Sequence, residues 1–166
     1  MQVRILGIDP GSQRCGYGVI ERDAAGRVTY VECGVLEPPA HAPLAARLAE
    51  IGLGLRELIE ELAPHAVAVE GVFHGKNARS ALQLGQSRGV ALMAAGEARL
   101  EVFEYAPATV KRSVAGNGAA TKLQVSAMVR SLCRLSRAPK LDASDALAVA
   151  ICHAFRMRAL ARPRAI

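Results

Sequence analysis

Hydrophobic residues near the start of the chain form short runs that break at turn residues, a pattern typical of a β-meander. The strands expected from these runs cover residues 3–9, 15–21 and 28–36. The first run is apolar almost without interruption up to Asp9, which predicts a central strand buried on both faces. Pro10-Gly11 then turns the chain back, so we expect the Asp9 carboxylate to lie where a buried strand reaches the surface. An Asp before Pro-Gly is also an ordinary turn residue, and this stretch by itself leaves both interpretations open.

The middle of the chain changes to a helical period. Apolar residues over 44–62 recur at helical spacing with Glu and Arg between them, which predicts a surface helix lying on the sheet. Pro64 ends this helix, and residues 65–70 form a second buried run that ends in a carboxylate, Glu70. A strand–helix–strand connection favours parallel pairing with a right-handed crossover. If the two buried strands are neighbours, Asp9 and Glu70 emerge at the same edge of the sheet.

The remainder of the chain alternates helices with one strand. The expected elements are a helix over 78–98, a strand over 101–105, a short helix over 107–114, a helix from 121 to about 135 and a last helix that follows residues 139–142 and runs to about 158. Thr121 and Gln124 have capping-box spacing. Asp142 is expected to cap the last helix, with Asp145 on the same face.

Two of these helices carry residues that suggest contacts. Gly85 and Gly89, with neighbouring alanines, make one side of the helix over 78–98 small; this suits close packing in the core, which we favour, or against a second subunit. Arg130 and Arg134 are expected on one face of the helix that starts at 121. The elements together predict an α/β fold with a five-stranded mixed sheet, three antiparallel strands then two parallel ones, flanked by helices. The expected domain covers residues 1–158, followed by a basic tail over 159–166.

Charge is distributed unevenly along the 166 residues. Up to Glu70 there are six Arg and ten acidic residues, a net charge of −4, and from Gly71 onward fifteen basic and five acidic residues give +10, together the formal charge of +6. A basic half on a compact domain suggests a polyanionic partner, most often nucleic acid, although a solvated basic surface would look the same. Aromatic residues make up only 4% of the chain, which argues against a stacking platform for single strands.

Targeting and redox signals are weak. The four cysteines are scattered without a Cys-x-x-Cys pair, which fits small buried residues in a reducing cytosol better than zinc or redox chemistry. No apolar run approaches the roughly 18 residues that span a bilayer, and the N-terminus lacks the layout of a signal peptide. We therefore expect a cytoplasmic protein.

Four carboxylates are expected to meet at one edge of the sheet: Asp9, Glu70, Asp142 and Asp145. Acids gathered with few local cations repel one another unless a divalent ion neutralises them, and oxygen-only ligands favour Mg²⁺ or Mn²⁺ over zinc. A two-metal site of this kind hydrolyses phosphodiesters, which suits the basic surface. Lys111 and Lys122, on either side of the turn Gly116-Asn117-Gly118, are placed for phosphate contacts at a helix start.

The motifs in this chain also resemble a known family. Residues 7–12 with 16–19, the block from Glu70 to Val90, the pieces over 102–105 and 110–125, and residues 142–148 together resemble the RuvC family of bacterial Holliday-junction resolvases, over nearly the whole chain and in order. The resemblance implies an RNase H-like fold acting as a homodimer. It further implies Mg²⁺-dependent symmetric nicking of two strands of a four-way junction, which leaves 5′-phosphate and 3′-hydroxyl ends, in company with the RuvA–RuvB branch-migration complex.

The resemblance also assigns residues. It makes Asp9, Glu70, Asp142 and Asp145 the catalytic metal ligands, with two Mg²⁺ expected per site and Mn²⁺ able to substitute. The expected DNA contacts are Phe73, Lys76, Arg79, Lys111 and Lys122, of which Phe73 alone could equally be a core residue. No role is expected for His74 or His153.

Three other interpretations remain open at this point. An Asp-x-Gly turn between two strands also opens the sugar-kinase and actin-like ATPases, but those proteins need a second such domain. A non-catalytic junction-binding module would not need four acids, which repel DNA when no metal neutralises them. An RNase H-like nuclease acting on RNA·DNA hybrids is distinguished only by the family resemblance.

Overall fold

The computed structural model describes residues 2–71 and 78–160, with side chains up to Met157. One five-stranded sheet runs through it in the order β3-β2-β1-β4-β5. The strands are β1 (Val3–Asp9), β2 (Cys15–Arg22), β3 (Val28–Leu36), β4 (Ala66–Glu70) and β5 (Glu101–Tyr105). The helices are α1 (Leu44–Leu62), α2 (Ala78–Glu97), α3 (Pro107–Ala115), α4 (Lys122–Leu132) and α5 (Leu141–Leu160). Within these residues, none of the helices is both long and apolar enough to cross a membrane.

The strand pairing confirms the expected mixed sheet. β1 pairs with β2 and β2 with β3 in antiparallel fashion, whereas β1 with β4 and β4 with β5 are parallel. Ile8 of β1 is in register with Val69 of β4. Asp9 and Glu70, each one residue further, therefore leave the sheet side by side at its carboxyl edge.

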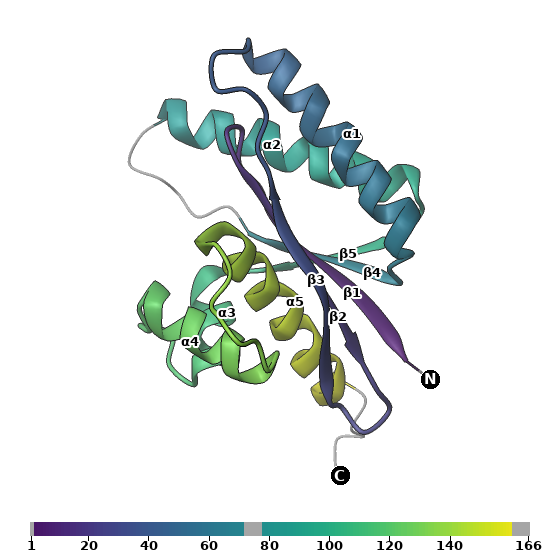
Figure 1. Ribbon diagram of the computed structural model, residues 1–166, viewed down its shortest axis with the longest axis vertical. Coiled ribbons are helices and arrows are strands. Elements are labelled where there is room, and N and C mark those ends of the chain that lie inside the picture. The colour runs from purple at the N-terminus through teal and green to yellow at the C-terminus, as the bar shows by residue number, and fades with distance from the viewer. Residues whose placement is uncertain (1, 72–77, 161–166) are drawn as a thin grey trace.

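Helices cover both faces of the sheet, as Figure 1 shows: α1 and α2 lie on one face, and α5 lies on the other with α3 and α4 beyond it. The two-residue period of β1 explains why both faces are apolar. Leu6 and Ile8 belong to the core under α1 and α2, whereas Ile5 belongs to the core under α5. A strand between two helical layers must be apolar on both sides, which accounts for the unbroken hydrophobic run in the sequence.

Helix α5 lies directly on the sheet because glycines leave room for its backbone. A Cβ atom at Gly7 would collide with the Ala146 carbonyl, and one at Gly16 would collide with the Asp142 carbonyl. A Cβ atom at Gly18 would likewise collide with Leu147. Since Gly16 pairs with Asp9 across β1 and β2, this contact brings the first turn of α5 against the end of β1.

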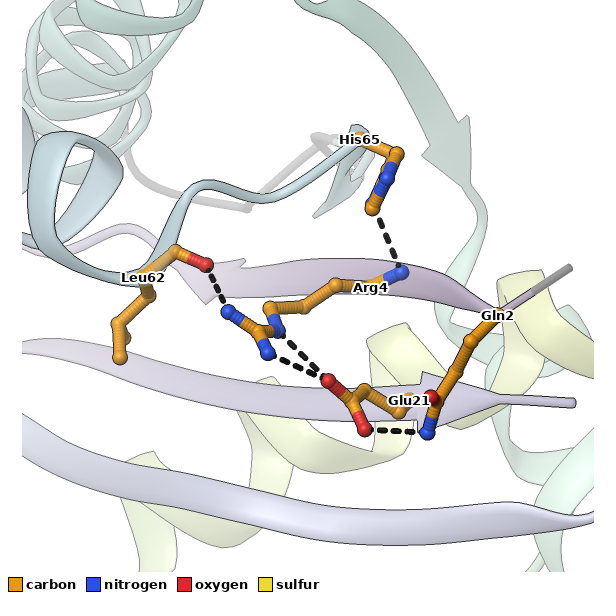
Figure 2. Close-up of polar contacts among 5 residues, drawn as sticks. All are labelled: Gln2, Arg4, Glu21, Leu62 and His65. Atoms are coloured by element: carbon orange, nitrogen blue, oxygen red, sulfur yellow. Dashed lines mark hydrogen bonds and ion pairs between the residues drawn. The ribbon is translucent and has the colours of Figure 1, made fainter.

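Arg4 closes the opposite, amino-terminal end of β1 (Figure 2). Its guanidinium binds Glu21 of β2 through Nε at 3.0 Å and Nη2 at 2.5 Å, and Nη1 donates to the Leu62 carbonyl at the end of α1. Gln2 donates to the second oxygen of Glu21, and the Arg4 backbone N–H donates to His65 Nδ1 at 3.0 Å. This hydrogen-bonded group ties β1, β2, α1 and the start of β4 together.

Several local expectations are wrong in detail. Asp142 is not the N-cap of α5, because the helix begins one residue earlier at Leu141 and includes Asp142 in its first turn. Arg134 is not on α4, which ends at Leu132; Arg134 adopts a left-handed φ of 53° in the loop that follows. Arg130 instead closes that loop by donating to the carbonyls of Leu135 and Ser136.

The small side of α2 divides between core and surface. Ala91, Ala94 and Ala95 are buried against the sheet, as expected. Gly85 and Gly89 are exposed, and apart from the adjoining backbone of α2 no described atom lies within 4 Å of a Cβ built on either, so core packing was the wrong expectation for these two. The capping box of Thr121 and Gln124 is confirmed at the start of α4.

Candidate active site

Two strands and one helix bring the four predicted carboxylates to the carboxyl edge of the sheet. Asp9 ends β1 and Glu70 ends β4, and the two strands are parallel neighbours. Asp142 and Asp145 lie in the first turns of α5, which presses onto Gly16 beside Asp9. All four side chains are partly exposed, so they border solvent while their backbones are held in the fold.

The acids act on one another electrostatically. Burial raises the pKa of Asp9 from its ordinary 3.8 to about 7, and the neighbouring charges of Asp145, Glu70 and Asp142 add to that rise. Burial and the charge of Asp145 likewise raise the pKa of Glu70. Burial is the larger cause of both shifts and repulsion between the acids the smaller one, and carboxylates perturbed in this way are common at functional sites.

Two lysines supply part of the missing charge. Lys122, the first residue of α4, places Nζ 2.7 Å from Oδ2 of Asp145, and this hydrogen bond raises the pKa of the lysine. Lys122 also lowers the pKa of Asp9 and, together with Lys111 of α3, that of Glu70. Glu70, Asp145 and the two lysines line one cavity of about 170 Å³. Acids and lysines therefore face a common space large enough for a few water molecules or a phosphate group.

The donor set fits divalent metal ions in its chemistry and its charge. All the candidate ligands are carboxylate oxygens, the donors that Mg²⁺ prefers, and a divalent cation would offset the repulsion between acids that adds to the raised pKa of Asp9. In the part of the chain that the structure describes, no three His, Cys, Asp or Glu side chains already form a metal-holding group. Binding of a metal ion would thus require the carboxylates to move closer together. Asp145 would also have to give up its hydrogen bond to Lys122 in favour of the ion.

The predicted DNA-contacting residues fall into three groups. Lys111 and Lys122 lie in the acid site, as described above. Arg79 lies in the exposed first turn of α2. Phe73 and Lys76, like His74, lie outside the described residues.

His153 does not take part in the acid site. It is 2% exposed in the core, where burial lowers its pKa to about 4. Its Nδ1 is 2.7 Å from the hydroxyl of Tyr105, and its ring lies 4.1 Å from that of Phe103. The expectation that His153 has no part in the chemistry agrees with this packing.

Sequence reasoning missed the glycines that place the site. Gly7, Gly16 and Gly18 allow the close approach of α5, and each lies within a strand, where glycine otherwise weakens a sheet. The signal available in the sequence was their spacing: Gly16 and Gly18 are two residues apart on β2 and therefore face the same side of the sheet, and Gly7 is the partner of Gly18 on β1. It indicates a second backbone lying close to the sheet.

A five-stranded mixed sheet in this order, with carboxylates at the ends of two parallel central strands and on a helix packed against them, defines the RNase H-like class of nucleases. The family model for "Crossover junction endodeoxyribonuclease RuvC" matches residues 5–153. The chain belongs to the RuvC family of crossover junction endodeoxyribonucleases, and is thus an enzyme of the nuclease class. The family is one of metal-dependent nucleases.

Relatives match along almost their entire length. The crossover junction endodeoxyribonuclease RuvC of Chloroflexus aggregans is 48% identical over 161 residues, covering 96% of this chain and 98% of the relative. That of Anaeromyxobacter sp. strain K is 54% identical over 162 residues, covering 97% and 85%. Among solved structures, Thermus thermophilus RuvC in complex with a Holliday junction substrate superposes with a TM-score of 0.89 at 35% identity, covering 95% of this chain and 96% of the other. The yeast mitochondrial Holliday junction resolvase Ydc2 shares the fold, with a TM-score of 0.67 at 14% identity over 95% and 82% of the two chains.

Proposed function

We propose that this enzyme resolves four-way DNA junctions by cutting two strands at symmetric positions, leaving 5′-phosphate and 3′-hydroxyl ends. The observation that carries the proposal is the gathering of four carboxylates beside two lysines at one sheet edge, in a chain of the RuvC family. The positive charge that dominates after residue 70 supports a nucleic-acid substrate in particular. We place this activity in the cytoplasm, where the chromosome of a bacterial cell lies.

Asp9, Glu70, Asp142 and Asp145 are the proposed metal ligands. Two Mg²⁺ ions, replaceable by Mn²⁺, would supply an activated water and stabilise charge on the leaving oxygen. The strand ends fix Asp9 and Glu70, so these two carboxylates define the position of the site within the fold. Asp142 and Asp145 complete it from α5, whose seat on Gly16 restricts how far they can move.

Lys111 and Lys122 are proposed to hold the scissile phosphate. Both lysines line the same cavity as Glu70 and Asp145, so a phosphate there would meet ammonium groups on one side and the acid site on the other. Fixed positive charge next to a phosphate that gains negative charge in the transition state favours reaction. Lys122 is bound to Asp145 in the free protein, and we propose that it turns to the phosphate once the acids are neutralised.

A symmetric pair of cuts requires two active sites, which a homodimer supplies. The exposed side of α2 supports such a dimer: Leu82 is 64% and Met93 47% exposed, and Gly85 and Gly89 leave open space between them. Apolar surface of this kind is typical of interfaces. Cooperation with the RuvA–RuvB complex stays a prediction from the family resemblance, to be checked by co-purification of the three proteins on junction DNA.

The decisive experiment compares cleavage of a synthetic four-way junction, a linear duplex and an RNA·DNA hybrid, with Mg²⁺ and with chelator. Paired nicks in the junction alone, lost with chelator, are expected. Cutting of the hybrid instead would retain the metal site but overturn the substrate. Tight junction binding without cutting in Mg²⁺ or Mn²⁺ would overturn the catalytic proposal in favour of a binding module.

A further inference from the structure

A second charged group lies near the acid site on its β2–β3 side, and nothing above gives it a role. Glu37, the residue after β3, binds two cations at once. Its Oε1 is 3.4 Å from Nε of Arg14, in the turn between β1 and β2, and its Oε2 is 3.2 Å from Nζ of Lys140, just before α5. One carboxylate thus joins two basic residues from separate segments.

The position of this group relative to the active site follows from the strand order. Lys111 and Lys122 approach the acids from the side of β4, whereas Arg14 and Glu37 flank the ends of β2 and β3 on the other side of β1. Lys140 stands two residues before Asp142. Basic side chains therefore lie on both sides of the carboxylates, along the edge of the sheet.

Two members of this group, Arg14 and Glu37, also line a groove of about 570 Å³ between the β1–β2 turn, the segment after β3 and the first turns of α2. Ser12, Gln13, Arg14, Ser80 and Gln83 line it, which are side chains with hydroxyl, amide and guanidinium groups that bind phosphate oxygens. Glu37 is the acidic member among its described lining residues. The polar side chains of this groove suit a phosphodiester backbone, whereas Glu37 would repel it; Pro38, Ala40 and Leu84 form the apolar part of the lining.

Stability does not explain why Glu37 is there. The side chains of Arg14, Glu37 and Lys140 are 66%, 42% and 70% exposed, and ion pairs so exposed contribute little to folding. A carboxylate does, however, present two oxygens that accept charged hydrogen bonds from arginine and lysine much as a phosphate does. Glu37 holds both basic groups in positions where one phosphate, or two neighbouring ones, could replace it.

We propose that Arg14 and Lys140 bind backbone phosphates of the DNA strand on the β2–β3 side of the active site, and that Glu37 occupies their place until DNA arrives. This inference rests on the proposed junction-cutting function and adds to it a second phosphate-binding site across the acids from Lys111 and Lys122. Glu37 is then a competitor of the substrate: it orients the two cations, and DNA must displace it.

The test is equilibrium binding of a fluorescent four-way junction between 50 and 200 mM salt, in chelator so that no strand is cut. Arg14→Gln and Lys140→Gln are each expected to reduce the slope of log K against log salt by about 0.9, which over this range is roughly a threefold to fourfold effect. Glu37→Gln is expected to tighten binding several-fold. In an Arg14→Gln, Lys140→Gln background, Glu37→Gln is expected to change nothing, because its effect passes through those two cations.

The chain offers a matched control pair in Arg56 and Glu97. Their side chains are 41% and 50% exposed, with Nε 2.6 Å from Oε2, and they join α1 to the end of α2, just before β5 enters the sheet at its amino-terminal edge. Arg56→Gln and Glu97→Gln change the net charge by the same amount as the test variants, but at the edge away from the acids. Both controls should bind the junction as the wild type does.

Wild-type slope and affinity in both Arg14→Gln and Lys140→Gln would overturn the inference. So would tighter binding of Glu97→Gln equal to that of Glu37→Gln, since the effect would then be one of net charge. Weaker binding of Glu37→Gln, with an unchanged unfolding midpoint, would show that Glu37 assists DNA and does not compete with it. Junction cleavage by the wild type in Mg²⁺ is measured alongside, so that failure of the proposed function is seen separately from failure of this site.

Discussion

The two ends of strand β1 carry opposite charges in opposite electrostatic states. At the amino-terminal end the cation Arg4 is matched by Glu21 and by the Leu62 carbonyl, and the carboxylate is in turn matched by Gln2 (Figure 2). At the carboxyl-terminal end burial, together with the charges of neighbouring acids, raises the pKa of Asp9 to about 7. The ends are only a few residues apart on one strand, so the difference comes from what is packed around each.

The comparison separates a charge with a structural role from charges that we propose to be functional. The Arg4 group satisfies its own hydrogen bonds and joins four elements, which is how a partly buried charge contributes to stability. At the other end Lys122 pairs with Asp145, but burial and repulsion between the acids still raise the pKa of Asp9 and of Glu70, a cost that a bound cation would offset. A folded protein tolerates such a site where it performs chemistry, at some cost in stability.

The largest expected effect is loss of catalysis at the acid end. Asp145→Asn should keep junction binding and lose cleavage by about a thousandfold or more, because several kcal/mol of charge stabilisation in the transition state depend on the acids. Single-turnover cleavage and junction binding, measured on one preparation, check this. Asp23→Asn, in the hairpin turn where Asp23 pairs with Arg27, is the matched control and should cut normally. Turnover close to wild type in Asp145→Asn would remove this residue from the proposed metal site.

The second largest expected effect is a gain in stability when Asp9, at the carboxyl-terminal end of β1, is neutralised. Asp9→Asn should raise the free energy of unfolding at pH 8 in chelator by about 2–4 kcal/mol, because it removes an ionised carboxylate whose folded pKa is about 7 instead of 3.8. The folded state binds more protons than the unfolded state between about pH 4 and 7, so wild-type stability should fall as pH rises through that window. Urea unfolding from pH 4 to 8 checks the slope, which should flatten in Asp9→Asn. If the free energy of unfolding had the same slope against pH in both proteins, Asp9 would not be the group responsible for that pH dependence.

At the amino-terminal end of β1 we expect a substitution to lower the free energy of unfolding instead of raising it. Arg4→Met should lower the free energy of unfolding by about 1–3 kcal/mol, since it leaves the Glu21 carboxylate, 19% exposed, without its cation. Arg27→Met removes a far more exposed arginine, at 83%, and should cost less than about 0.5 kcal/mol. Urea unfolding of both variants provides the comparison. If Arg4→Met were as mild as Arg27→Met, the two ends of β1 would not differ as described.

The smallest effect concerns the lysine between acids and substrate. Lys122→Ala should reduce the salt dependence of junction binding by about one unit of slope and slow cleavage by about tenfold. Binding titrations at several salt concentrations and single-turnover rates measure the two quantities. Full activity together with an unchanged slope would place Lys122 outside the DNA-binding surface and leave it a partner of Asp145 alone.

Most of the helices and strands could be predicted from the hydrophobic periodicity of the sequence. The strands ending at Asp9 and Glu70 are present within a residue of their expected bounds, because burial between two helical layers leaves a local apolar signature. The confirmed capping box at Thr121 is likewise local, since Thr121 and Gln124 are three residues apart. The expected start of α5 was wrong by two residues, because the helix begins at Leu141 and takes Asp142 into its first turn.

Contacts between distant segments were beyond this reasoning. The pairing of Lys122 with Asp145 joins residues 23 apart in sequence, and that of Lys140 with Glu37 joins residues 103 apart. Neither pair has a periodic signal, because many acids and bases along the chain could pair equally well. Only the packing of helices on the sheet selects among them.

The sequence by itself determined the order and kind of the elements, the family, and the four acids to be tested, since each of these depends on residues that are local or matched in order. The tertiary structure decided how those acids sit. Gly16 allows α5 to approach the end of β1, and burial there raises the pKa of Asp9, while Arg4 at the far end is paired with Glu21 and the Leu62 carbonyl. Charge compensation depends on distances between side chains from separate elements. Those distances exist only once the chain has folded.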